Sequence, residues 1–193
     1  VAGESRHDIY NAIFEDCDVL HSMADWTTEV GALAVYICDA AKVHHIVFRN
    51  IRVRQESNYA ICCVITRDKW SSDERAGQVE DILFEDIKMD GVLTPFVVNS
   101  YYWCCDPDGH STYVSTKEPL PVDERTPRIK ELAFRNIEAH NCHVAGTFIY
   151  GLPEAKIEKV TMENIEIDFA ENPTPEYPAM MAEVEPCTNR GVF

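Results

Sequence analysis

The chain has 193 residues, 46% hydrophobic and 26% charged, a composition that suits a soluble protein with one core or one rod of repeats. No apolar run reaches the roughly 18 residues that span a bilayer, so we expect no membrane partner. The formal net charge of −16 repels phosphate backbones and no basic stripe is present, which excludes nucleic-acid binding.

Five segments along the chain share one apolar pattern. They are Asp8–Val19, Lys42–Val53, Gln78–Met89, Arg128–Ala139 and Lys156–Ile167. Aligned on one position, they bring into register Phe14, Phe48, Phe84, Phe134 and Met162. Apolar residues alternate within each segment, which predicts a strand with one buried face. Recurrence of such strands predicts a repeat architecture.

A short polar side chain follows the aligned residue by two positions in every segment. These residues are Asp16, Asn50, Asp86, Asn136 and Asn164. The next apolar residue comes three positions after the aromatic instead of two, so we expect a bend between them. Asp and Asn suit left-handed backbone geometry, and stacked copies can form a ladder of side-chain hydrogen bonds.

A second apolar run follows each segment. These runs are Gly31–Cys38, Ala60–Ile65, Thr94–Val98, Val144–Tyr150 and Ala179–Val184. Each repeat then supplies two strands that bury their faces only by stacking on the next repeat. The prediction is a right-handed parallel β-helix (a β-solenoid) of about five to seven coils, with residues 1–193 as one all-β domain. The longest insertion, Tyr101 to Thr126, is the candidate functional loop.

Two other folds compete with the β-helix. A doubly wound α/β fold requires amphipathic helices between the strands, and no convincing helical periodicity is present. A jelly roll or another antiparallel sheet stays open as an alternative, because short strands at regular spacing fit it as well.

The eight cysteines form no CxxC pair, so we expect no structural zinc site and no other metal or cofactor. Cys17, Cys62 and Cys142 lie in or beside apolar runs, where a free thiol packs as a small hydrophobe. Free buried thiols favour a reducing compartment, and the expected location is the cytoplasm. A secreted or periplasmic location is the alternative if the N-terminus is truncated.

Several stretches beyond the repeat carry a family resemblance. They include Met89–Asn99 (MDGVLTPFVVN), Tyr102–Val114 (YWCCDPDGHSTYV) and His140–Pro153 (HNCHVAGTFIYGLP). These resemble the C-terminal coils of polygalacturonase-like glycoside hydrolases, which are pectin-lyase-like right-handed β-helices. The resemblance implies that the chain is the C-terminal portion of a longer hydrolase that acts on galacturonan through clustered carboxylates.

The resemblance also implies sites, and the sequence matches them only in part. The family's N-x-D motif, Asp-Asp pair and G-H-G motif are absent, so the catalytic residues are unknown. A family R-I-K motif binds the substrate carboxylate, but Arg128-Ile129-Lys130 instead opens the fourth repeat. We expect Arg67 and Lys69 to make the anion contact, with a solvated turn as the alternative.

Three further residues are candidates for contact with a poly- or oligosaccharide such as galacturonan. Tyr102 and Trp103 carry aromatic rings that stack on sugar faces, and His110 lies in the same resembling stretch. In that stretch Asp106 and Asp108 flank a proline beside a glycine, which favours a tight turn over a catalytic pair.

The histidine pairs favour packing and hydrogen bonding over metal binding, because spacing offers no third ligand. They are His44 with His45, and His140 with His143. Three functions therefore compete: a portion of a galacturonan hydrolase, a non-catalytic carbohydrate-binding or scaffold β-helix, and a glycosidase of other specificity using carboxylates such as Asp25, Asp68 or Asp73. An open β-helix end also predicts self-association.

Overall fold

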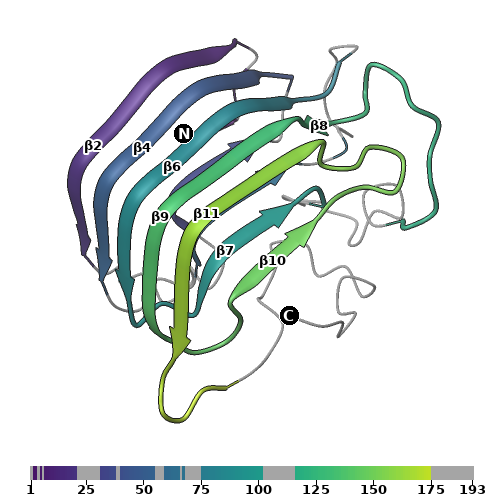
Figure 1. Cartoon of the computed structure of the whole chain (residues 1–193). Helices are drawn as coiled ribbons and strands as arrows, with labels where there is room; N and C mark the ends of the chain where they lie inside the picture. Colours follow the sequence, from purple (N-terminus) through teal and green to yellow (C-terminus); the bar gives the residue numbers. More distant parts are fainter. Residues whose placement is uncertain are drawn as a thin grey trace.

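The computed structural model describes residues 2–3, 5, 7–20, 31–37, 40–54, 59–65, 67, 75–101 and 116–174. These residues form β-strands in two sheets, and every strand pair is parallel (Figure 1). These ranges contain no helix, and therefore none that is long and apolar enough to cross a membrane. The two sheets stack in a solenoid-like arrangement.

The long-strand sheet holds the five predicted repeats. Its strands are β2 (Ile9–Leu20), β4 (Lys42–Arg54), β6 (Gln78–Asp90), β9 (Glu131–Cys142) and β11 (Lys159–Phe169), with the short β8 (Arg128–Ile129) paired to β6. In space they run in the order β2, β4, β6, β9, β11. The aligned aromatic positions lie directly opposite one another from Phe14 to Met162, so the predicted register is confirmed.

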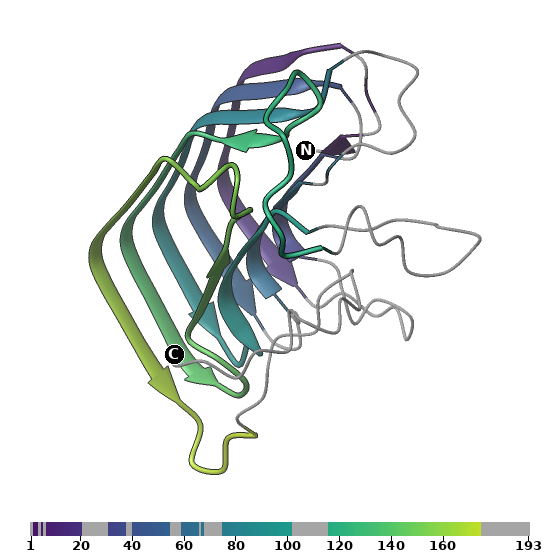
Figure 2. The same ribbon diagram turned by 90° about the vertical axis from the view of Figure 1, so that its right-hand side faces the viewer.

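Each long strand bends at the predicted polar residue, as the side view shows (Figure 2). The φ angles of Asp16, Asn50, Asp86, Asn136 and Asn164 are 58°, 50°, 54°, 52° and 53°. Asn136 Nδ2 donates to Asp86 Oδ1 over 3.0 Å, and Asn164 Nδ2 donates to Asn136 Oδ1 over 2.9 Å. Left-handed backbone is tolerated best by Asn, Asp and Gly, so these Asp and Asn residues are the local cause of the bend. Their side-chain hydrogen bonds join one strand to the next.

A second left-handed position precedes the first in three strands and was not predicted. It is occupied by Asn11, His45 and Asp81, with φ of 55°, 55° and 54°. Histidine is among the residues enriched in this conformation.

The short-strand sheet holds the second apolar runs. Its order is β1 (Ala2–Gly3), β3 (Gly31–Ile37), β5 (Tyr59–Ile65), β7 (Thr94–Asn99) and β10 (Thr147–Tyr150). Four of the five predicted runs are thus confirmed as strands, and Ala179–Val184 lies outside the described residues. At Gly31 a Cβ atom would stand 2.4 Å from Cys62 Cβ, so only glycine permits β3 and β5 to approach in this way.

The core lies between the two sheets and runs along the stack. The rings of Phe48, Phe84 and Phe134 are stacked, with successive centroids 4.9 Å and 5.4 Å apart. Phe96 on β7 meets Phe134 edge-on at 5.2 Å and so links the two sheets. Stacked and edge-on rings add attraction to the burial of apolar area.

Two sequence alternatives are resolved by the pairing. An antiparallel jelly roll is wrong for the described strands, because all of them pair in parallel. Assigning Arg128 and Ile129 to the start of a repeat is confirmed, since they pair with Gln78 and Val79, which in turn pair with Lys42 and Val43.

Candidate functional site

Arg67 lies just beyond the end of β5 and is almost fully buried, with 1% of its surface exposed. Its Nε and Nη2 atoms donate to the two carboxylate oxygens of Glu154 over 2.7 Å and 2.8 Å. Its Nη1 donates to the carbonyl oxygen of Thr116 over 2.7 Å. The guanidinium also lies 5.5 Å from the ring centroid of Tyr101. A bidentate arginine–carboxylate pair of this kind is among the strongest charge-assisted hydrogen-bonding arrangements in proteins.

This geometry bears on the two expectations for Arg67. The solvated-turn alternative is wrong, because neighbouring segments enclose the side chain. The anion at its guanidinium is Glu154 of the same chain, and contact with a substrate carboxylate stays a prediction. The other sequence candidates, Lys69, Tyr102, Trp103 and His110, lie outside the described residues. The same holds for Asp25, Asp68, Asp73, Asp106 and Asp108.

The outer face of the short-strand sheet is largely closed by a second apolar cluster. Its buried members are Cys62, Val64, Val97, Tyr101, Phe148 and Leu152. At its margin Lys117 Nζ lies 4.9 Å above the ring of Tyr150, and both residues are half-buried. We call Lys117 and Tyr150, with the adjoining Arg67–Glu154 pair, the aromatic rim. Two described residues of the predicted functional loop, Tyr101 at its start and Thr116 within it, contact Arg67.

Sequence reasoning missed three members of this rim: Lys117, Tyr150 and Glu154. Tyr150 ends a predicted strand, but nothing local marks it as a partner of a lysine 33 positions earlier in the sequence. Glu154 follows a Gly-Leu-Pro turn and meets Arg67 across 87 positions. The one local signal for Glu154 was its position directly after the stretch His140–Pro153, which carries the family resemblance.

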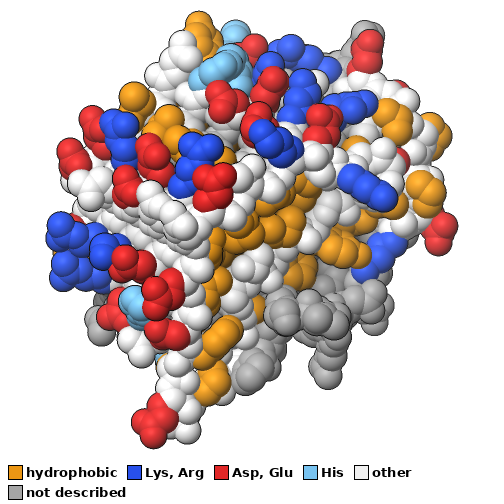
Figure 3. Space-filling view, viewed as in Figure 1, with side chains coloured by type: hydrophobic (Ala, Val, Ile, Leu, Met, Phe, Trp, Pro, Cys, Tyr) orange, Lys and Arg blue, Asp and Glu red, His pale blue; other side chains and the backbone are white. Residues whose placement is uncertain are grey.

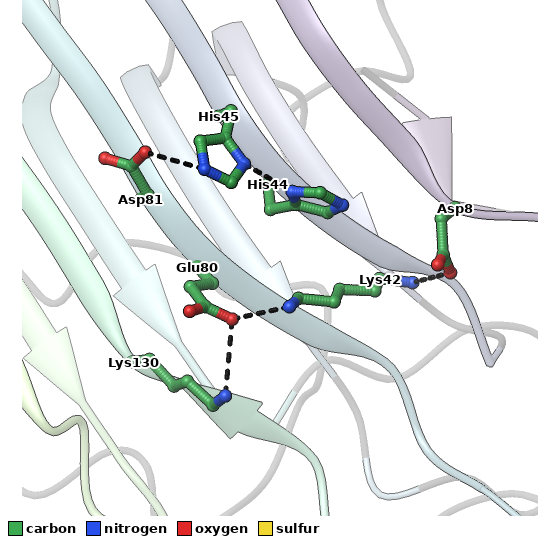
Figure 4. Close-up of polar contacts among 7 residues, drawn as sticks. All are labelled: Asp8, Lys42, His44, His45, Glu80, Asp81 and Lys130. Carbon is green, nitrogen blue, oxygen red and sulfur yellow. Dashed lines mark hydrogen bonds and ion pairs between the residues drawn. The ribbon is translucent and has the colours of Figure 1, made fainter.

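A second polar cluster lies on the outer side of the long-strand sheet (Figure 4). Glu80 accepts from Lys42 at 2.7 Å and from Lys130 at 3.2 Å, and these two ammonium groups, Lys42 first, hold the pKa of Glu80 below its usual range. His45 Nε2 lies 3.6 Å from Asp81, while the Nδ1 atoms of His44 and His45 face each other. No group of three metal-binding side chains occurs among the described residues.

Carboxyl groups on this outer side are tuned toward the ionised form. A hydrogen bond from Lys88 lowers the pKa of Glu138, and one from the Asn141 amide, followed by one from His140, lowers the pKa of Asp168. The pKa of Glu80 is likewise lowered, by Lys42 and Lys130. A glycosidase acid needs the opposite shift, since it must hold a proton near neutral pH. These three groups therefore lack the property of a general acid.

The His140–Asp168 pair should give stability a defined pH dependence. His140 Nδ1 lies 2.5 Å from Asp168 Oδ2, and this bond raises the pKa of His140. The histidine's contribution is full below the ordinary imidazole pKa and is lost as pH rises through the raised value. The contribution of Asp168 is full above the ordinary carboxyl pKa and is lost as pH falls through the lowered value. Both act together between about pH 4 and about pH 6.5.

An NMR titration of the His140 ring checks this directly. In Asp168→Asn the pKa of His140 should fall toward its ordinary value. Glu163→Gln changes an exposed carboxylate of the same strand, which pairs with Arg135, and should leave that pKa in place. An unchanged His140 pKa in Asp168→Asn would refute the pairing.

The described cysteines are free thiols, and three of them are inert. Burial raises the pKa of Cys62 and of Cys142 to about 12, and it raises the pKa of Cys63 further. The packing expected for Cys62 and Cys142 is confirmed. Cys17 is exposed, contrary to expectation, because no described strand covers the side of β2 away from β4.

No family model, curated protein or solved structure matches this chain.

Proposed function

We propose that this chain is a right-handed parallel β-helix related to the polygalacturonase-like hydrolases, and that it binds a pectic polysaccharide at the aromatic rim. The carrying observation is that Arg67 and Lys117 lie against two neighbouring rings. Arg67 lies 5.5 Å from the ring centroid of Tyr101, whose ring is 5.2 Å from that of Tyr150, and Lys117 Nζ lies 4.9 Å from the ring centroid of Tyr150. Arg67 follows β5 at the point where the resemblance expects an anion-binding residue. Aromatic rings with nearby polar groups are the usual means of holding a pyranose.

The β-helix part of the proposal is supported by the repeat. Each of the first four repeats contributes one long strand followed by one short strand, and successive repeats pair in parallel within both sheets. A β-helix is the simplest path that connects such strands, because each repeat passes from one sheet to the other and back.

Binding without cleavage is favoured over hydrolysis for the described residues. The family's carboxylate motifs are absent, and Glu80, Glu138 and Asp168 are held in the ionised form. The Arg67–Glu154 pair serves as a rigid support for the rim, since each charge already has its counter-ion.

Charge constrains the kind of polysaccharide. A chain of net charge −16 repels a polyuronate over long range, and added salt screens that repulsion. We therefore expect methyl-esterified pectin to bind more tightly than polygalacturonate at low salt, and the difference to shrink as salt is added.

Affinity electrophoresis in gels containing each polymer tests the proposal. Tyr150→Ala should weaken binding about 3- to 10-fold, whereas Tyr150→Phe should keep it, because the ring is the expected contact. Tyr10→Ala removes an exposed tyrosine on β2, far from the rim in the sheet order, and serves as the control.

The same samples are assayed for release of reducing ends. Equal binding by the wild type and Tyr150→Ala would remove the rim as the site. Release of galacturonic acid would show that the chain is a hydrolase and that binding alone understates its function.

A further inference from the structure

Two consecutive histidines of β4 lie on the same side of the long-strand sheet. In a regular strand, successive side chains alternate between the two faces. His44 and His45 interrupt that alternation, because both lie between the buried residues Val43 and Ile46, with His44 half-buried and His45 exposed. The local cause is the left-handed backbone of His45, whose φ is 55°. The strand therefore presents two imidazole rings side by side on its outer face.

The two rings face each other through their Nδ1 atoms (Figure 4). Their planes are inclined at 72° and their centroids are 4.7 Å apart. The ring of Tyr10 is stacked on that of His44, with centroids 5.3 Å apart, and this contact helps to hold the His44 ring in its orientation. Figure 3 shows histidine side chains at the surface of this face among acidic and basic groups, so solutes can reach them.

Asp81 on β6 determines which nitrogen of His45 carries the proton. Its Oδ2 lies 3.6 Å from His45 Nε2, which is an ion-pair separation, and its negative charge favours the tautomer that is protonated at Nε2. The lone pair of His45 Nδ1 is then directed at His44. A carboxylate placed behind a histidine in this way is the usual means by which proteins orient a metal-binding imidazole.

We propose that His44 and His45 bind one divalent transition-metal ion of the class that prefers imidazole, such as Zn²⁺, through their two Nδ1 atoms. Two metal–nitrogen bonds of about 2.0–2.1 Å place the nitrogens about 3.3 Å apart at a tetrahedral metal. Here the two nitrogens are in hydrogen-bonding contact, with His44 Nδ1–H as the donor. Binding therefore turns the exposed His45 ring slightly outward, and the proton of His44 moves from Nδ1 to Nε2 as the metal takes its place.

The chemistry of the pair selects the kind of metal. Imidazole nitrogen suits Zn²⁺, Ni²⁺ and Cu²⁺, whereas Mg²⁺ and Ca²⁺ prefer oxygen ligands. Glu80, the other carboxylate of this cluster, is already paired with Lys42 and Lys130, so it adds no oxygen ligand. The net charge of −16 attracts cations to the chain over long range.

A site with two protein ligands differs from the sites that the sequence excluded. Histidine spacing argued against a metal because it offers no third ligand, and the described residues bring no third ligand to the pair. Two imidazoles leave the remaining coordination positions to water or to a ligand from another molecule. The site lies on the outer face of the long-strand sheet, and the aromatic rim lies on the short-strand sheet, so the metal site does not depend on the proposed polysaccharide binding.

Zinc binding by the full chain tests the proposal, measured by competition with a chromophoric chelator. Other histidines and cysteines of the chain can also take up zinc, so variants are compared. The double variant His44→Gln/His45→Asn removes both imidazoles and retains at position 45 a side chain that tolerates left-handed backbone. It should bind one Zn²⁺ ion fewer per chain than the wild type. The control His140→Gln removes a histidine that is paired with Asp168 and should leave the zinc signature of the His44–His45 pair intact.

That signature is read by long-range ¹H–¹⁵N NMR of the histidine rings in the wild type. Added Zn²⁺ should shift the Nδ1 signals of His44 and His45 together, and excess Mg²⁺ should not reverse the shift. Asp81→Asn should weaken this binding about tenfold, because the orienting carboxylate is lost. Glu163→Gln makes the same change of charge on β11 and should leave it unchanged.

Three outcomes overturn the proposal. The first is equal zinc stoichiometry in the wild type and in the His44→Gln/His45→Asn variant. The second is the absence of any shift of the His44 and His45 Nδ1 signals, a result that does not depend on how any variant folds. The third is displacement of the zinc by excess Mg²⁺, which would assign the ion to the carboxylates instead of the imidazoles.

Discussion

Replacing Phe84 by alanine is expected to lower the free energy of unfolding by about 3–5 kcal/mol. Phe84 is fully buried, and its ring is stacked between those of Phe48 and Phe134. Removing it opens a cavity in the middle of the stack, where repeats on both sides hold the walls in place. Urea denaturation followed by circular dichroism measures the loss.

Phe14→Ala is the matched control for this prediction. It removes the same side chain at the equivalent position of the terminal strand, where 40% of the surface is already exposed. We expect the free energy of unfolding to fall by only about 1 kcal/mol there, because the Phe14 ring buries less apolar area on folding than the Phe84 ring does. Equal losses in the two variants would mean that the stack does not become tighter toward its centre.

Arg67→Ala is expected to lower the free energy of unfolding by about 3–5 kcal/mol, because it leaves the buried carboxylate of Glu154 without its counter-ion. The side chains of Arg67 and Glu154 are 1% and 4% exposed, and the guanidinium bonds both carboxylate oxygens. Glu154→Gln should cost less than Arg67→Ala, because the neutral amide can still accept a hydrogen bond.

Two comparisons sharpen that test. Arg49→Ala breaks the exposed pair with Glu15 and should change stability little, because water solvates both charges. The double variant Arg67→Met/Glu154→Leu replaces both charges by apolar groups and should recover much of the loss. If Arg67→Ala proves as mild as Arg49→Ala, the pair is not buried in solution.

Arg67→Ala and Tyr150→Ala together separate structure from function at the aromatic rim. Arg67 supports the rim through Glu154 and Thr116, so its loss should affect folding and glycan binding together. Tyr150 contributes a half-buried ring at the margin, so its loss should affect binding more than folding. A variant series measured for both properties therefore tells a supporting residue from a contact residue.

Local sequence determined the strands and their alignment. The Asp and Asn residues at the bend were predictable, because left-handed backbone selects few side chains and each repeat places one at the same position. The register from Phe14 to Met162 followed from the alternation of apolar residues, since a slip by one residue would turn the buried face outward.

The earlier bend at Asn11, His45 and Asp81 escaped prediction, because His45 gives no turn signal on its own. The burial of Arg67 escaped for a different reason. Its counter-ion Glu154 lies 87 positions away, and only the packing of the later repeat brings the two together.

Repetition thus let the sequence by itself determine strands, bends and register, because each depends on the side chains of one segment and on the equivalent positions of its neighbours. The tertiary structure alone decided which charges are buried and which partners they find. Those properties depend on insertions of unequal length between the repeats, and no local pattern encodes which distant segments those insertions bring together.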